Sequence, residues 1–250
     1  MTIKYVDDST YINKICDMLQ VVEHEEVTGI EEAALVAFNS IQNGGLLHVF
    51  STGHSHMIVE EMFYRAGGLI PVNPILDNSL MLHEGAITST ENERLHGKAQ
   101  EVLSKVNLQK GDTIIVSSNT GINAVPVEAA LYAKSMGVTV IGVTSVEASK
   151  ELKSRHIDGK KLYEVSDIVV DNHAPIGDGM VYVPTNGQMT GGASTFSSLF
   201  IAQRIVLKIE NLYLANGLTP PIFMSANIPG GDEHNARAIT KYQDRIRALR

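Results

Sequence analysis

The chain has 250 residues, of which 44% are apolar and 19% charged, and its formal net charge is −8 at pH 7. This balance is typical of a soluble globular protein, and the acidic character excludes a nucleic-acid partner, because phosphate backbones are bound by basic surfaces. No stretch approaches the roughly 20 apolar residues of a membrane span. The single cysteine, Cys16, and an amino-terminal segment without a signal-type apolar core indicate a cytoplasmic protein.

The first 44 residues are predicted to form two helices. Apolar residues recur at intervals of three and four in both halves of this segment, first from Ile12 to Val22 and then from Ile30 to Ile41. We predict the break between the helices at Thr28–Gly29 and the end of the second helix at residues 43–45, which read Asn-Gly-Gly.

Residues 45–217 alternate between short apolar runs and helical patterns. The predicted strands are 46–50, 68–73, 112–118, 138–145 and 167–172, and the predicted helices are about 56–66, 90–107, 123–136 and 192–216. Near-continuous apolar strands separated by helices predict an α/β fold with a parallel sheet covered on both faces. Residues 74–90 have little periodicity, and a loop of that length is usually functional or mobile.

The remaining residues, 218–250, form an extension. Its prolines predict an extended connector over 218–231, followed by one more helix. We interpret the whole chain as one domain, with amino-terminal helices at 1–44, an α/β core at 45–217 and this extension.

Hydroxyl and amide side chains follow the predicted strands. Ligands of open parallel sheets bind beyond the carboxyl ends of the strands, where strand order reverses. Residues 51–55 read Ser-Thr-Gly-His-Ser and residues 117–121 read Ser-Ser-Asn-Thr-Gly, whereas lysine and arginine are scarce there. This pattern favours an anion site made of hydroxyls and backbone N–H groups, although turn and capping chemistry explains any single loop equally well. The dinucleotide and P-loop glycine motifs are both missing.

Residues 112–145 resemble the second half of a sugar isomerase (SIS) domain. The family pattern has Ser-x-Ser-Gly after a strand, and this chain has Ser118-Asn119-Thr120-Gly121. The sequence HVFSTGHS resembles the first phosphate-side loop, usually Gly-x-Gly-x-Ser, at Gly53 and Ser55 but departs from it at Ser51. The resemblance covers roughly residues 10–215. It implies a three-layer sandwich with about five parallel strands in flavodoxin-like topology, preceded by a helical pair.

Two further segments narrow the resemblance. GGDEHNARAITKYQDRI and DNHAPIGDG are similar to a group of SIS proteins of unassigned function, the UPF0309-like proteins. This group lies near the phosphoheptose isomerases and the N-acetylmuramic acid 6-phosphate etherases. The same two segments contain Asp, Asn and His residues at 171–178 and 231–235. They leave open a metal site built from both, although we expect no metal or other cofactor.

The SIS resemblance implies a phosphorylated sugar as ligand and a homodimer or higher homo-oligomer. The implied phosphate ligands are Ser55, Ser118, Thr120 and Gly121, followed by Ser51, Gly53 and Asn119, and at a later helix start Ser194 and Thr195. For Ser194, plain helix capping is the alternative.

Sugar-phosphate isomerisation needs groups that carry protons. By analogy with the etherases, Glu91 is our first choice of base and Glu93 the second. Glu60, Glu61 and His54 are further candidates, although a single glutamate on a helix usually faces solvent. We therefore expect a phosphosugar isomerase of the phosphoheptose-isomerase type, or a related amino-sugar-phosphate enzyme or lyase. The alternatives are a non-catalytic module that senses a sugar phosphate and a structural partner of a sugar enzyme.

Overall fold

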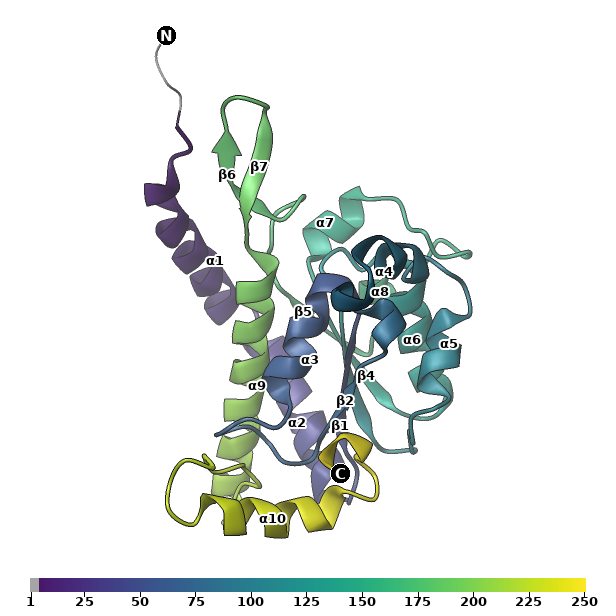
Figure 1. Ribbon diagram of the computed structural model, residues 1–250, viewed down its shortest axis with the longest axis vertical. Coiled ribbons are helices and arrows are strands. Elements are labelled where there is room, and N and C mark those ends of the chain that lie inside the picture. The colour runs from purple at the N-terminus through teal and green to yellow at the C-terminus, as the bar shows by residue number, and fades with distance from the viewer. Residues whose placement is uncertain (1–4) are drawn as a thin grey trace.

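Five parallel strands form the central sheet of the computed structural model, which describes residues 5–250 (Figure 1). The strands are β1 (Leu47–Ser51), β2 (Val72–Ile75), β3 (Thr113–Ser117), β4 (Thr139–Thr144) and β5 (Ile168–Asp171). They lie in the order β2-β1-β3-β4-β5, and all pairs are parallel. The predicted sheet is confirmed, and strand order reverses between β1 and β3, as in the flavodoxin-like topology.

Helices cover both faces of this sheet. One face packs against α2 (Val27–Gln42), α3 (Met57–Met62) and α9 (Ser194–Ala215), and the other against α5 (Lys98–Leu103), α6 (Ala124–Ser135) and α8 (Leu162–Val165). Side chains of β3 alternate accordingly: Ile115 packs with α9, whereas Ile114 and Val116 pack with α6. The α/β prediction with three layers is therefore confirmed. No helix within residues 5–250 combines the length and apolarity of a membrane crossing.

The amino-terminal helices are α1 (Tyr11–Glu25) and α2, and the break between them falls at Glu26 instead of Thr28–Gly29. Gly29 lies inside α2, where a Cβ atom would come within 2.9 Å of the Val169 carbonyl oxygen. This glycine therefore lets α2 approach β5 closely and does not interrupt the helix. Gly44, with φ +83°, follows the end of α2, as the sequence predicted.

Two stretches differ from the predicted pattern. Strand β2 starts at Val72 and not at residue 68, because residues 68–70 pair with the connector around Ile222. The predicted helix 90–107 is two helices, α4 (Ala86–Asn92) and α5, because Gly97 adopts a left-handed conformation (φ +80°) between them. The unpatterned residues before α4 form short 3-10 turns at Asn78–Leu80 and Leu82–Glu84.

A β-hairpin, β6 (Gly179–Val183) and β7 (Gln188–Gly192), stands beside α1 and away from the main sheet (Figure 1). Two hydrogen bonds tie it to α1: Tyr11 Oη donates to the Gly192 carbonyl and Lys14 Nζ to the Met180 carbonyl, each at 2.7 Å. This hairpin was not predicted, although residues 186–187, Asn-Gly, are a common hairpin turn.

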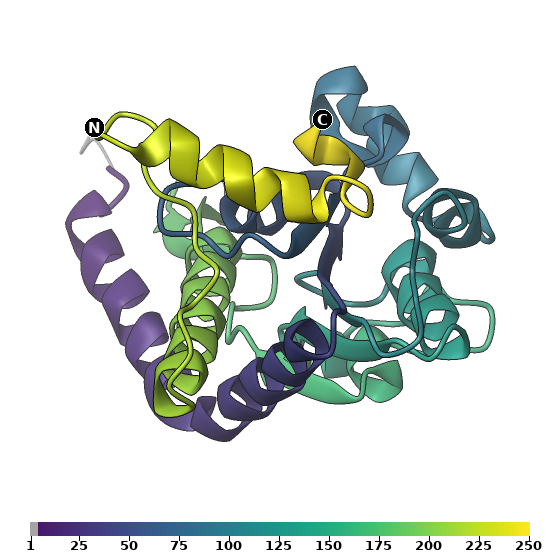
Figure 2. The ribbon, with the colours of Figure 1, turned by 90° about the horizontal axis from the view of Figure 1, so that it is seen from below.

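The carboxyl-terminal segment covers the amino end of the sheet (Figure 2). It consists of the connector, α10 (Gly231–Tyr242) and a final 3-10 turn, Arg247–Leu249, so the last helix is shorter than predicted. Phe223, Ile246 and Leu249 pack against Leu46 and Ile70 in a small apolar cluster.

A buried carboxylate joins this segment to the sheet. Asp112 is 1% exposed, and its carboxylate accepts four hydrogen bonds. The donors are His48 Nε2 (3.0 Å), the Arg245 guanidinium (2.7 Å) and the backbone N–H groups of Leu46 (2.9 Å) and Gln109 (2.8 Å). Burial alone raises the pKa of Asp112, but these donors together lower it to about 2.

We predict that Asp112→Asn destabilises the fold by about 2–3 kcal/mol at pH 7, because Arg245, whose side chain is 21% exposed, loses its charged partner. Because the folded-state pKa lies below the ordinary 3.8, the contribution is complete above about pH 4 and is lost as pH falls through about 2. Urea unfolding of wild type and variant should therefore differ at pH 7 and converge toward pH 2. The exposed Asp244→Asn variant is the control. A difference of less than about 1 kcal/mol at pH 7 would contradict this role.

Candidate functional site

Two adjoining cavities, of about 290 and 160 Å³, lie at the carboxyl ends of β1 and β3. Both are lined by His54, Ser55 and Asn119. They occupy the point where strand order reverses, which is where the sequence predicted a ligand. We call the larger the hydroxyl cavity, after its lining of Thr52, Ser55, Ser89, Thr90, Ser118 and Thr120, and the smaller the hairpin-side cavity.

The loop after β1 supplies one wall of the hydroxyl cavity. Thr52, Gly53, His54 and Ser55 all line it, and Gly53 adopts a left-handed conformation (φ +55°) at the start of the turn. The Ser55 hydroxyl forms no hydrogen bond within residues 5–250 and is free to bind a ligand. Ser51 departs from its predicted role. It is fully buried, and its hydroxyl donates to the Ser117 carbonyl at 2.7 Å, so it joins β1 to β3 instead of facing the cavity.

The loop after β3 supplies the facing wall. Ser118, Asn119 and Thr120 line the hydroxyl cavity, and the Ser118 Oγ accepts the Gly121 N–H at 3.3 Å. Gly121 itself lies behind the wall. With φ +61°, it approaches Thr144 so closely that a Cβ atom would come within 2.8 Å of its hydroxyl. Glycine is required there for packing against β4. Gly121, which was predicted as a phosphate ligand, therefore does not face the cavity.

A neighbouring amide positions Asn119. Asn172, at the end of β5, is fully buried, and its Nδ2 donates to Asn119 Oδ1 at 3.1 Å. The Asn119 carbonyl in turn accepts the Ser145 N–H at 2.8 Å. The Asn119 side chain is therefore held in place between the two cavities.

Glu93 is the carboxylate of the hydroxyl cavity. It follows the end of α4, and its carboxylate accepts hydrogen bonds from the Thr52 hydroxyl (2.8 Å) and from the Asn123 amide. Asn123 precedes α6 but does not cap it; its Oδ1 accepts a hydrogen bond from Arg155 at 2.7 Å. Burial raises the pKa of Glu93, against a lowering contribution from the Thr52 hydrogen bond.

The other predicted acids lie outside both cavities. Glu91 is exposed on α4. Residues two positions apart on a helix point in nearly opposite directions, and Glu93 occupies the side that faces the cavity. Glu60 is exposed on α3. Glu61 pairs with Arg65 and accepts from Gln203 at 2.6 Å, so it stabilises the contact between α3 and α9. Of the four glutamates predicted as candidate bases, Glu93 lines the hydroxyl cavity, whereas Glu91, Glu60 and Glu61 line neither cavity.

The histidines of the first loop differ in environment. His54 is exposed and lines both cavities, as its predicted role requires. His56, which the sequence analysis did not select, is buried; its Nδ1 bonds the Gly53 carbonyl at 3.1 Å and its Nε2 has no partner within residues 5–250. Burial lowers the pKa of His56, so this ring is neutral near pH 7.

The hairpin-side cavity includes the start of α9, with Ser194, Thr195 and Asp178. Asp178 has φ +62°, and its carboxylate accepts from the N–H groups of Ala193 (3.1 Å) and Ser194 (2.6 Å) and from the Ser194 hydroxyl (3.0 Å). A carboxylate therefore already occupies the amino end of α9. This arrangement disfavours a phosphate at Ser194 and leaves that residue as a partner of Asp178.

The two Asp/Asn/His segments do not come together. Residues 171–178 follow β5, whereas residues 231–235 begin α10 at the opposite end of the molecule (Figure 1). In the first segment His173 pairs with Glu26 at 3.0 Å, and in the second His234 contacts the Ile222 carbonyl at 2.9 Å. A joint metal site is therefore ruled out by geometry, and no cluster of three or more His, Cys, Asp or Glu ligands occurs within residues 5–250.

Comparison with known proteins identifies the family. A model of the SIS domain matches residues 10–145. The chain belongs to the SIS domain family. A UPF0309 protein of Halalkalibacterium halodurans is 44% identical over 249 residues, covering 96% of each chain. A second, from Geobacillus kaustophilus, is 43% identical over 244 residues, covering 96% of this chain and 95% of its own.

Solved structures show the same SIS fold. A phosphoheptose isomerase from Francisella tularensis superposes with a TM-score of 0.52 at 15% identity, covering 81% of this chain and 96% of that one. The phosphoheptose isomerase of Neisseria gonorrhoeae gives 0.51 at 14% identity with the same coverage. The resemblance stated from the sequence, to SIS proteins of the UPF0309 group, is confirmed.

We predict that Glu93→Gln raises the melting temperature at pH 7.5 relative to wild type. The folded-state pKa of Glu93 is raised, so its ionisation opposes folding at high pH and has no effect below the ordinary pKa. The glutamine can accept from Asn123 and donate to the Thr52 hydroxyl. Thermal unfolding at pH 4 and 7.5 should show a gain only at the higher pH, with exposed Glu91→Gln as control. A loss of stability at pH 7.5 would contradict the assigned environment.

Proposed function

We propose that this protein binds a phosphorylated sugar in the hydroxyl cavity and interconverts aldose and ketose forms by proton transfer. The observation that carries the proposal is the position of Glu93. This half-buried carboxylate faces the same cavity as the free hydroxyls of two strand-to-helix loops. The structural neighbours described as phosphoheptose isomerases support the proposal.

The phosphate would lie between the two loops. The Ser55, Ser118 and Thr120 hydroxyls and the backbone N–H groups of residues 53–55 offer several donors without any lysine or arginine in the cavity lining. Hydrogen bonds to an ionised group are stronger than those between neutral groups. A phosphate held here leaves the sugar carbons to extend toward Glu93 on one side and toward the hairpin-side cavity on the other.

Glu93 then acts as the base. Its carboxylate removes the proton from the carbon beside the carbonyl, and the resulting enediol accepts a proton back at the neighbouring carbon. His54, at the junction of both cavities, is positioned to protonate the carbonyl oxygen, which stays a hydroxyl in the product, and then to take up the proton that the neighbouring hydroxyl oxygen releases as it becomes the new carbonyl. The raised pKa of Glu93 makes it a stronger base at neutral pH than an exposed carboxylate.

The test separates binding from turnover. Calorimetry against pentose, hexose and heptose phosphates identifies a ligand, and NMR then follows solvent deuterium incorporation into it. Ser118→Ala/Thr120→Ala should weaken binding, because each hydrogen bond to a charged group contributes about 1.5–3 kcal/mol. Glu93→Gln should keep the affinity and reduce exchange by a factor on the order of 100 or more.

Two matched variants control this experiment. Ser135→Ala removes an exposed hydroxyl far from the cavity, and Glu91→Gln removes the outward carboxylate of the same helix turn. Neither should change affinity or exchange. Unchanged binding in the Ser118/Thr120 double variant would contradict the phosphate position. Binding without exchange in the wild type would instead favour the sugar-phosphate-sensing module.

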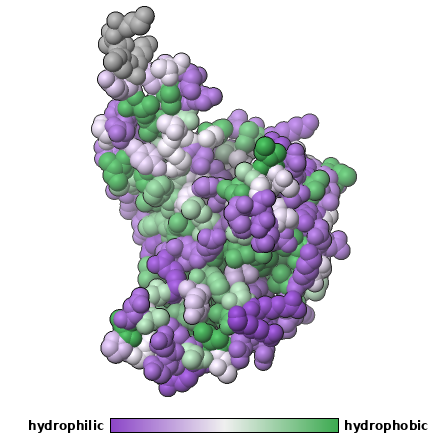
Figure 3. All heavy atoms as spheres, viewed as in Figure 1, coloured by the Kyte–Doolittle hydropathy of each residue, from purple (hydrophilic) through white to green (hydrophobic). Residues whose placement is uncertain are grey.

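We further propose that the protein is a homodimer built on the projecting part of the molecule. Helix α1 buries Ile15, Met18 and Val22, whereas Ile12 is 63% exposed on its other side. The neighbouring hairpin exposes Met189, and Figure 3 shows apolar residues among polar ones over this part. Apolar side chains exposed side by side in this way are typical of a protein–protein interface.

Sedimentation velocity at micromolar concentration should find a dimer for the wild type and a monomer for Ile12→Glu/Met189→Glu. Ile157→Glu changes an isoleucine of similar exposure on a distant loop and should remain a dimer. A monomeric wild type would contradict the proposal.

A further inference from the structure

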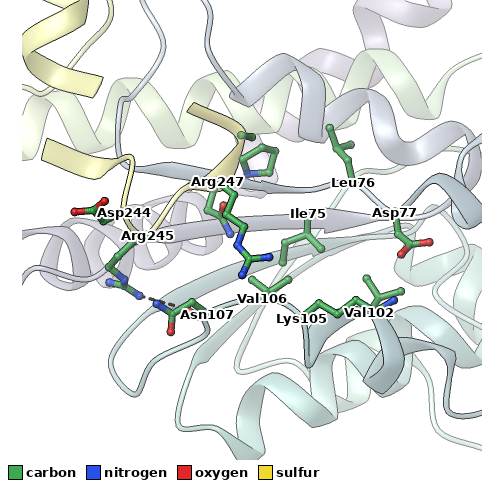
Figure 4. Close-up of a pocket in the computed structure, with 13 residues that line it drawn as sticks. Ile75, Leu76, Asp77, Val102, Lys105, Val106, Asn107, Asp244, Arg245 and Arg247 are labelled. Atoms are coloured by element: carbon green, nitrogen blue, oxygen red, sulfur yellow. Dashed lines mark hydrogen bonds between the residues drawn. The ribbon is translucent and has the colours of Figure 1, made fainter. Parts of the chain in front are cut away.

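A larger cavity, of about 470 Å³, lies away from the SIS site (Figure 4). It is enclosed by the outer edge of β2, the segment that follows α5 and the carboxyl-terminal residues 244–248. None of its lining residues lines the hydroxyl cavity or the hairpin-side cavity. Its volume is in the range of about 300–1,000 Å³ that small-molecule sites occupy.

Three cations line this cavity in a protein whose net charge is −8: Lys105, Arg245 and Arg247. The Arg247 side chain projects into the middle of the cavity, and within residues 5–250 no carboxylate pairs with it (Figure 4). Lys105 pairs only with the exposed Glu101, at 3.3 Å. The charges of Arg247 and Lys105 therefore remain available to an anion.

Acidic groups in the lining do not cancel this charge. Asp244 extends into solvent, with 94% of its side chain exposed, and pairs at 3.6 Å with Arg250, which is outside the lining. The Asp77 carboxylate accepts hydrogen bonds from the N–H and hydroxyl groups of Ser79. Asp77 and Arg245 lie at opposite ends of the cavity, with Arg247 between them (Figure 4).

The Arg245 side chain is held in a fixed position at one end of the cavity. Its guanidinium is fixed by Asp112 at 2.7 Å and by the carbonyl oxygens of Gly44 (3.2 Å) and Asn107 (3.4 Å). Its Nε is buried and has no hydrogen-bond partner within residues 5–250. A fixed guanidinium with an unmet donor loses little conformational freedom when an anion binds beside it.

The uncharged lining residues indicate which chemical class of ligand the cavity can bind. Ile75, Val102 and Val106 provide an apolar floor, and the Asn107 amide provides groups that hydrogen-bond hydroxyls, whereas the Asn73 amide nitrogen is already bonded to His48. No aromatic residue lines the cavity, so a nucleotide base would find no stacking partner. This combination suits a short hydroxylated molecule that carries an anionic group.

We propose that this cavity is a second ligand site, which binds a small non-aromatic phosphate monoester such as a polyol phosphate. Arg247 and Lys105 hold the phosphate, and the carbon chain lies on the apolar floor toward Arg245. The inference does not depend on the proposed isomerase activity, because the two sites share no lining residue.

Arginine side-chain NMR tests the site directly. Neither SIS cavity has an arginine or lysine in its lining, so the Nε–Hε signals of Arg245 and Arg247 report on this cavity alone. Titration with glycerol 3-phosphate should shift both signals to saturation. Glycerate at the same concentration distinguishes a phosphate site from a general carboxylate site, and sodium chloride at matched ionic strength controls for screening. Signals are assigned from their loss in Arg247→Lys and Arg245→Lys.

The Lys105→Ala/Arg247→Ala variant should weaken this binding at least tenfold. Both residues are exposed and neither belongs to the SIS site, so folding and sugar-phosphate binding there should be unchanged. Arg237→Ala, an exposed arginine on α10, should bind as the wild type does. Shifts that do not saturate, or that are equal with sodium chloride, overturn the site. Backbone shifts confined to residues 53–55 and 118–121 overturn it too, while leaving the proposed function intact.

Discussion

The parallel pairing of β1 with β3 brings the two halves of the SIS site together. Ser51 lies opposite Ser117 in the register, and the Ser51 hydroxyl closes the pair by donating to the Ser117 carbonyl. The two loops therefore leave the sheet side by side, starting at Thr52 and Ser118. One then enters α3 on the first face of the sheet and the other enters α6 on the second face. The space between diverging helices becomes the cavity, and hydroxyls from both loops face it.

The buried Asp112 and the half-buried Glu93 have opposite pKa shifts, and the difference separates a structural carboxylate from a candidate catalytic one. Asp112 receives hydrogen bonds from His48 and Arg245 and from two backbone amides, and its pKa falls to about 2. These donors compensate the cost of burying the Asp112 carboxylate, so Asp112 stabilises the contact between the sheet and the carboxyl-terminal segment. Glu93 receives hydrogen bonds only from the neutral Thr52 and Asn123, and burial raises its pKa. A half-buried carboxylate beside a cavity, whose pKa burial raises more than the nearby Arg94 and Arg155 lower it, is the arrangement expected of a group that exchanges protons.

Much of this architecture could be predicted from sequence because it depends on strong local patterns. Strands β3 and β4 are apolar runs rich in β-branched residues, and the hydroxyl loops directly follow β1 and β3. At the site, two differences from the prediction are shifts of one or two residues. The first strand ends at Ser51 and not at residue 50, which turns that hydroxyl inward. A step of two residues along α4 exchanges the outer Glu91 for the inner Glu93. The cavity beside Arg247 joins segments distant in sequence, and no local pattern indicates it.

A crystal structure of the protein with a bound ketose phosphate tests the central claim most directly. We expect the phosphate within hydrogen-bonding distance of Ser55, Ser118 and Thr120, with the Glu93 carboxylate about 3 Å from the carbons that exchange the proton. A phosphate bound elsewhere, or a sugar whose carbonyl carbons point away from Glu93, would contradict it.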